Sequence, residues 1–258
     1  DEMPREYEGV TIVEKLDEAV PLDLPFRDET GATVQLGDYF AEDVPVILTL
    51  NYYRCPQLCT LTLNGLVDAL NDIDWSAGKE FRIVTVSIAP EEGPELAEVK
   101  KRAYLTQYDR AGAAEGWSFL VGGPKAIEAL AEATGFGYRR DAATGEYIHS
   151  SSIMFLTPDG RLSRYMNDVS FQPKDVRLAL VEASQGAIGT PMERFLLFTC
   201  FQYDPERGSY TASVRKLMKT GGIVTIAGIL VAILVLGRLG PKRALGFPGR
   251  VALGGLKS

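Results

Sequence analysis

Histidine and cysteine are scarce in this sequence. Its 258 residues include one His and three Cys. Three cysteines are too few for a framework of disulfide bonds. A single histidine, His149, excludes every metal site that needs two imidazole ligands, so a metal ion would have to combine His149 with Cys, Met or carboxylate groups. Internal repeats and low-complexity blocks are also lacking, which favours one sizeable globular core.

Positive charge is in deficit everywhere except at the C-terminal end. The chain has 27 Lys and Arg against 34 Asp and Glu. Five of the basic residues and none of the acidic ones lie in residues 220–258, so residues 1–219 hold 22 basic against 34 acidic residues, a net charge of −12. Nucleic-acid binding requires a basic face, and we therefore expect no nucleic-acid partner.

A long run without charge occurs once, in residues 220–237, TGGIVTIAGILVAILVLG. Its length is near the lower limit for crossing a bilayer as a helix, and basic residues flank both of its ends. A buried core helix is the alternative, but the run has no polar face. We predict a juxtamembrane segment over 191–219, a transmembrane helix over 220–240 and a short tail over 241–258. The acid-free tail favours a cytoplasmic C-terminus, which would place the rest of the chain on the extracytoplasmic (periplasmic) side of the cell membrane.

Hydrophobic patterning divides the remainder into an irregular lead-in, 1–43, and a domain, 44–190. Continuous apolar runs predict buried strands, amphipathic stretches that open with proline predict helices, and a Pro-Asp-Gly turn predicts a hairpin. In chain order these segments are 44–52 (strand), 56–73 (helix), 81–88 (strand), 94–108 (helix), 117–122 (strand), 124–135 (helix), 151–166 (hairpin) and 172–186 (helix). Alternating strands and helices pair in parallel, and the hairpin adds antiparallel strands. We therefore expect an α/β, thioredoxin-like fold, a mixed sheet flanked by helices.

Two cysteines, Cys55 and Cys59, lie at the first strand-to-helix junction, in NYYRCPQLCTLTLNG. Residues four apart share a helix face, and a helix N-terminus stabilises thiolates. Such a pair can exchange with a disulfide or bind a soft metal. Two buried, inert cysteines are the alternative.

His149 precedes the predicted hairpin, at a junction that comes close to the first helix in a thioredoxin-like fold. Two thiolates and one imidazole would form a three-ligand set that suits copper, because soft thiolates favour Cu(I). Structural zinc requires four ligands, and no obvious fourth exists.

Four stretches resemble the Sco/SenC family of copper-handling assembly factors for cytochrome c oxidase. They are YRCPQLCTLTL, VTVSIAPEEGPE, GWSFLVGGPKAIEALAEATGFGY and HSSSIMFLTPDGRLSRY, and the resemblance covers about residues 20–186. It implies a membrane-anchored thioredoxin-like domain outside the cytoplasm, with Cys55, Cys59 and His149 as copper ligands. It also implies a partner, subunit II of cytochrome c oxidase or another respiratory subunit, whose CuA site receives copper or has its thiols reduced.

The sequence departs from the family pattern in three places. Thr60 follows the second cysteine where the family commonly has Pro, and Ile148 precedes the histidine where Asp is common. The loss of that carboxylate is expected to alter the tautomer or basicity of the imidazole. The predicted membrane anchor follows the domain, whereas in most members we expect it to precede the domain.

Other functions stay open at this stage. The chain is not expected to be a turnover enzyme unless Cys55 and Cys59 form the redox pair of a thiol–disulfide oxidoreductase. An accessory subunit of a respiratory complex is a further alternative, and a thiol peroxidase fits less well. Cys200, in FLLFTCF, is interpreted as a packed apolar residue, and the acids of APEEGPE, 89–95, as a solvated cluster that caps a helix.

Overall fold

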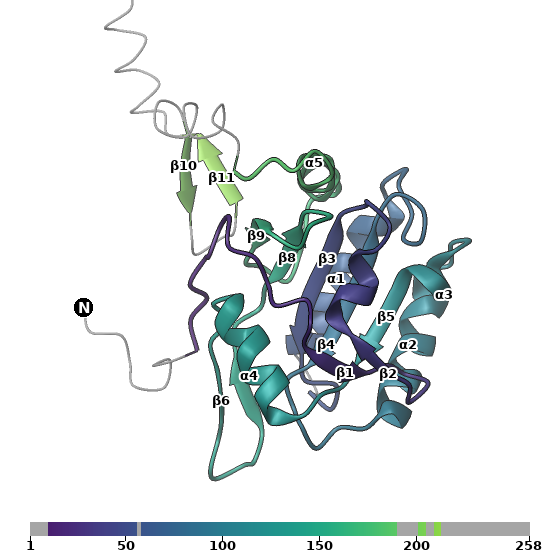
Figure 1. The fold of residues 1–258 in the computed structure, drawn as a ribbon. Coiled ribbons are helices and arrows are strands. Elements are labelled where there is room, and N and C mark those ends of the chain that lie inside the picture. Colours follow the sequence, from purple (N-terminus) through teal and green to yellow (C-terminus); the bar gives the residue numbers. More distant parts are fainter. Residues whose placement is uncertain (1–9, 56–57, 190–200, 205–208, 213–258) are drawn as a thin grey trace, which may run out of the picture.

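A five-stranded mixed sheet forms the centre of the protein, for which a computed structural model describes residues 10–55, 58–189, 201–204 and 209–212 (Figure 1). The sheet strands are β3 (Val46–Asn51), β4 (Arg82–Ser87), β5 (Trp117–Leu120), β8 (Ile153–Leu156) and β9 (Leu162–Met166). Their order is β5-β4-β3-β8-β9. β3, β4 and β5 pair in parallel, whereas β8 is antiparallel to both β3 and β9. The expected mixed sheet is confirmed.

Five helices accompany these strands in the described part of the chain. They are α1 (Leu58–Asn71), α2 (Pro94–Gln107), α3 (Ala113–Gly116), α4 (Pro124–Ala133) and α5 (Pro173–Ser184). α2, α4 and α5 each begin with proline, whose fixed φ suits the first helical turn and whose missing N–H is not needed there. The four predicted helices correspond to α1, α2, α4 and α5, with shifts of a few residues at their ends.

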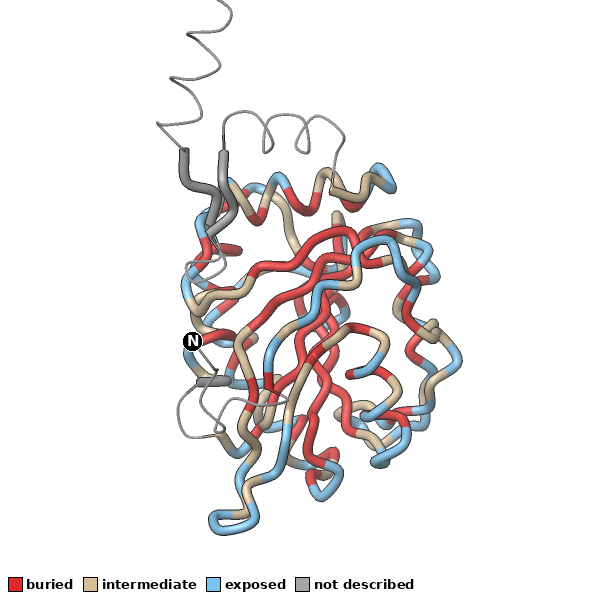
Figure 2. The backbone as a smooth tube through the Cα atoms, turned by 90° about the vertical axis from the view of Figure 1, so that its left-hand side faces the viewer, coloured by how far each residue is buried: buried red, intermediate tan, exposed pale blue. Residues whose placement is uncertain are grey.

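Two hydrophobic clusters cover the two faces of the sheet. Alternate residues of each strand point to opposite faces, so Ile47 joins one cluster and Leu48 the other. The first cluster includes apolar residues of α1, α2 and α5, and the second includes residues of α4 and of the lead-in. Because both faces are covered, every residue of the five strands except Arg82 is buried, which explains the nearly continuous apolar sequence of β3 (Figure 2).

The lead-in is more regular than the sequence suggested. Residues 25–40 contain β1 (Pro25–Arg27), β2 (Thr33–Gln35) and a 3-10 helix, η2 (Leu36–Phe40). β1 and β2 pair in an antiparallel hairpin, and Phe26 and Leu36 are buried in the second cluster. This part of the lead-in therefore contributes to the hydrophobic core.

Two further hairpins were not expected. β6 (Tyr138–Arg140) pairs with β7 (Tyr147–His149), and β10 (Phe201–Asp204) pairs with β11 (Ser209–Ala212). The second of these lies within the predicted juxtamembrane segment. The predicted transmembrane helix, the tail and Cys200 lie outside the described residues. Within the described ranges, none of the helices has the length and hydrophobicity that a membrane span requires.

Gly65 allows α1 to approach the loop after β9. A Cβ atom at this position would lie 2.0 Å from the carbonyl oxygen of Val169, which is backbone and cannot swing away. A Cβ atom added to Gly123, the N-cap of α4, would have no neighbouring atom within 4 Å. The φ of Gly123 is negative, so other residues can adopt its backbone conformation.

We expect Gly65→Ser to lower the free energy of unfolding by about 2 kcal/mol or more, because the added atoms must displace packed backbone. The matched variant Gly123→Ser should change it by less than about 0.5 kcal/mol, since serine is a good N-cap and meets no neighbour. Chemical denaturation of the full-length chain measures both. Equal stabilities would contradict the close approach of α1 to residue 169.

Candidate metal and thiol site

Residues 52–55, here called the cysteine loop, are bound to the sheet by buried groups. The loop follows β3, and its backbone turns where the Cys55 N–H donates to the Tyr52 carbonyl at 3.0 Å. The hydroxyl of Tyr53 lies 2.9 Å from the Thr85 carbonyl oxygen and 2.8 Å from that of Leu120. Complete burial, followed by the charge of Glu92, raises the pKa of Tyr53 well above its usual value, so the phenol remains a donor.

The carboxylate of Glu92 accepts hydrogen bonds from the backbone of the cysteine loop. Its Oε2 accepts from the Tyr53 N–H at 2.9 Å, and its Oε1 accepts from the Arg54 N–H at 2.8 Å. The Ser87 hydroxyl donates to Oε2 at 2.6 Å. Glu92 is only 4% exposed. The interpretation of APEEGPE as a solvated cluster is therefore wrong for Glu92.

The two cysteines lie on either side of the start of α1. Cys55 is partly exposed and lies in the cysteine loop, before the described part of the helix. Cys59 is the second residue of α1 as described, near the helix end where N–H groups and the helix dipole favour a thiolate. The side chain of Cys59 lies outside the described residues.

His149 is the last residue of β7, in what we call the histidine hairpin, residues 138–149. Its side chain is 8% exposed, and its ring lies 5.6 Å from the ring of Phe136, centroid to centroid. Its Nδ1 is 2.8 Å from the carbonyl oxygen of Ser150. A carbonyl only accepts, so Nδ1 is the donor and the neutral ring carries its lone pair on Nε2. A backbone carbonyl thus sets the tautomer of the neutral ring.

Strand pairing brings the cysteine loop and His149 to the same end of the sheet. β3 runs antiparallel to β8 with Thr49 opposite Ile153, so the chain that leaves β3 passes the residues that lead into β8. Contacts on both sides confirm this proximity. The rings of Tyr52 and Tyr147 meet edge to face at 5.4 Å, and the hydroxyls of Thr62 and Ser151 are 2.7 Å apart.

These contacts flank the predicted ligands in both segments. Cys55 and Cys59 lie between Tyr52 and Thr62, and His149 lies between Tyr147 and Ser151. Among the described side chains no group of three or more His, Cys, Asp or Glu is placed to hold a metal ion. Because the Cys59 side chain is outside that set, the three-residue ligand set stays a prediction. Met154 and Met166, whose thioethers are soft donors, are buried in the core.

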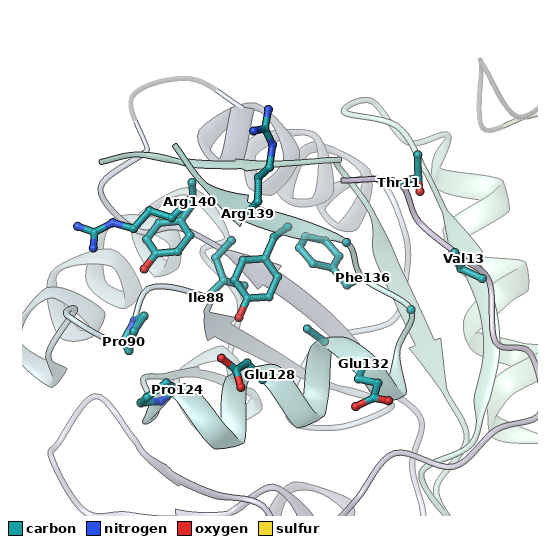
Figure 3. A pocket seen from close by; sticks show the side chains of 15 residues that line it. Thr11, Val13, Ile88, Pro90, Pro124, Glu128, Glu132, Phe136, Arg139 and Arg140 are labelled. Carbon is teal, nitrogen blue, oxygen red and sulfur yellow. The ribbon is translucent and has the colours of Figure 1, made fainter. Parts of the chain in front are cut away.

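A cavity of about 740 Å³ opens beside the histidine hairpin (Figure 3). Glu128 and Glu132 of α4 line one side, and Arg139 and Arg140 of β6 line the other. The cavity lining includes Phe136 but neither His149 nor Cys55. His149 and Cys55 therefore lie outside the lining of this cavity.

The fold and the strand-to-helix position of the cysteines define a thioredoxin-like protein. The SCO1/SenC family model matches residues 18–183, and the chain belongs to this family. No match was found among curated proteins.

Solved structures share the fold. A protein from Aquifex aeolicus VF5, described as a candidate electron transfer protein, has a TM-score of 0.58 and 22% identity, over 67% of this chain and 96% of that one. Arabidopsis thaliana ScoI, solved with copper bound, has a TM-score of 0.50 and 16% identity, over 63% and 96%. BsSco, described as a Sco family cytochrome c oxidase assembly protein with a disulfide switch, has a TM-score of 0.50 and 20% identity, over 67% and 98%. At these identities the likeness shows the fold alone.

Ser151 links the two halves of the site and the loop after β9. Its hydroxyl contacts Thr62 Oγ1 at 2.7 Å and donates to the Asp168 carbonyl at 2.6 Å. We expect Ser151→Ala to lower the free energy of unfolding by about 1–3 kcal/mol, because partly buried polar groups lose a partner. Ser184→Ala, which removes an exposed hydroxyl from the end of α5, is the control and should cost less than about 0.5 kcal/mol. A Ser151 variant as stable as the control would show that this link contributes nothing.

Proposed function

We propose that this protein binds copper through Cys55, Cys59 and His149 and passes it to the CuA centre of cytochrome c oxidase subunit II. In this role copper is cargo, and the protein is a metallochaperone and assembly factor, with no turnover chemistry of its own. The observation that supports the proposal is the pair of contacts, Tyr52–Tyr147 and Thr62–Ser151, between residues that flank the two cysteines and residues that flank His149.

The donor groups suit this cargo. Thiolate and imidazole are ligands that copper accepts, and the two thiolates favour Cu(I). The Nδ1 hydrogen bond of His149 leaves Nε2 as the nitrogen with the donor lone pair. Cys55 is partly exposed, which suits a site that must exchange its metal with a partner protein. Membership of the SCO1/SenC family and the copper-bound structure of Arabidopsis thaliana ScoI support the same assignment.

We expect the reduced full-length chain to bind one Cu(I) per molecule under anaerobic conditions. Cys55→Ser and Cys59→Ser should abolish tight binding, and His149→Ala should weaken it by about 10-fold or more, because each removes a ligand. Cys200→Ser is the matched control and should bind like the unmodified chain. Competition with a chromophoric Cu(I) chelator measures the affinities.

A Cu(I) affinity that is the same in His149→Ala and in the unmodified chain would favour a thiol–disulfide oxidoreductase instead. In that reaction one thiolate attacks a partner disulfide, and the second cysteine releases the mixed disulfide. Cys55 and Cys59 are oxidised to a disulfide while the partner is reduced to a dithiol. Reduction of a model disulfide at equal rates by the unmodified chain and by His149→Ala would favour this function over copper delivery. Isolation at fixed stoichiometry with active oxidase would favour an accessory subunit.

We further propose that residues 220–240 cross the cell membrane and hold the domain on its extracytoplasmic side. Removal of residues 220–258 should therefore move the protein from the membrane to the soluble fraction, because the uncharged run is lost. Removal of 241–258 alone should leave it in the membrane, and an impermeant thiol reagent should label Cys55 in intact cells. A full-length chain recovered in the soluble fraction would overturn this proposal.

A further inference from the structure

Two adjacent glutamates in the loop between β4 and α2 contact the two halves of the candidate site separately. Glu92 accepts hydrogen bonds from the backbone of Tyr53 and Arg54, directly before Cys55. Glu91 accepts a hydrogen bond from the hydroxyl of Tyr147 at 3.0 Å, two residues before His149. Their side chains therefore connect one short loop to both the cysteine loop and the histidine hairpin.

The loop that carries the two glutamates is itself well fixed. The Glu92 N–H donates to the Ala89 carbonyl at 3.0 Å, and the Ala89 N–H donates to the Ser87 hydroxyl at 3.1 Å. Directly after it, Gly93 is the N-cap of α2 and the buried Pro94 is its first residue. Negative charge is favourable at this helix end. The glutamates thus extend from a rigid support.

The two contacts differ in burial and hence in strength. Glu92 is buried, and its two oxygens accept three hydrogen bonds, two of them from backbone N–H groups. Charge-assisted hydrogen bonds of this kind are the stronger class. Glu91 is exposed, and besides its hydrogen bond from Tyr147 it forms a long ion pair with Arg140, at 3.8 Å. Burial and the hydrogen bond to Glu91 raise the pKa of Tyr147 to about 12, so its hydroxyl stays a donor.

We propose that Glu91 and Glu92 are positioning residues that fix the cysteine loop relative to His149. Glu92 orients Cys55 through the loop backbone, and Glu91 orients His149 through Tyr147. This inference rests on the proposed copper site, because the two glutamates hold its ligands at the separation that copper binding requires. Neither glutamate touches the copper in this arrangement.

A cycle of variants in the full-length chain separates the two roles. Glu92→Gln replaces one of the two carboxylate oxygens with an NH2 group. That group cannot accept a hydrogen bond, so it faces a backbone N–H of the cysteine loop donor to donor. We expect this variant to weaken Cu(I) binding by about 10-fold, both with His149 present and in the His149→Ala background. Glu91→Gln should weaken binding by about 2- to 3-fold with His149 present and have no effect in the His149→Ala background. Competition with a Cu(I) chelator is the measurement.

Glu92→Gln affinity within 2-fold of the unmodified chain would overturn the role of Glu92. An effect of Glu91→Gln that persists without His149 would overturn the role of Glu91. Where Glu92→Gln does not fold, Ser87→Ala removes only one donor from the same carboxylate and should weaken Cu(I) binding by about 3-fold. Unchanged affinity of that variant would count against the proposal.

Two measurements without copper distinguish failure of this inference from failure of the proposed function. In a chain with Cys59→Ser and Cys200→Ser, Glu92→Gln should raise the rate of Cys55 alkylation by iodoacetamide at least 3-fold, because the loop loosens and a nearby negative charge is lost. His149 is the only histidine, so its ring resonance is unambiguous in NMR spectra. Glu91→Gln should shift that resonance, and Glu92→Gln should not. Absence of these changes would overturn the positioning roles even if copper binds, and their presence would uphold them even if copper does not.

Discussion

The pairing of β3 with two neighbours of opposite direction is the constraint on which the site depends. β3 pairs in parallel with β4 and antiparallel with β8. Parallel pairing places the ends of β3 and β4 together, so Glu92, after β4, reaches the cysteine loop after β3. Antiparallel pairing places the start of β8 at that same end, so His149 arrives there from the other side. A sheet of uniform direction would separate these groups.

Burial of both faces of the sheet keeps this pairing unique. A shift of one residue along β3 would exchange the residues that face the two hydrophobic clusters. Such a shift would also carry Tyr53 away from the Thr85 and Leu120 carbonyls, leaving a buried hydroxyl without its partners. The position of the cysteine loop is therefore fixed by the core as a whole and by specific hydrogen bonds at its end.

Much of the architecture could be predicted from the sequence because the strongest signals are local. The buried runs that became β3 and β4, the prolines that open three helices, and the Pro-Asp-Gly turn between β8 and β9 all act over a few residues. β6 and β7 were missed because each is three residues long and partly exposed, so neither has a clear hydrophobic pattern. Glu92 was misjudged for a different reason. A carboxylate next to Gly and Pro has the sequence signature of a solvated turn, and its burial becomes favourable through the long-range backbone N–H donors of residues 53 and 54 together with the Ser87 hydroxyl.

The hydrogen bond from His149 to the Ser150 carbonyl has an evolutionary consequence. A carboxylate partner at position 148 can be lost by a single substitution, whereas a main-chain carbonyl is supplied by every amino acid at position 150. The orientation of the imidazole is thereby protected from side-chain mutation at position 150. The same property makes the interaction invisible to motif comparison, since a pattern of side chains does not record which carbonyl a ring nitrogen meets.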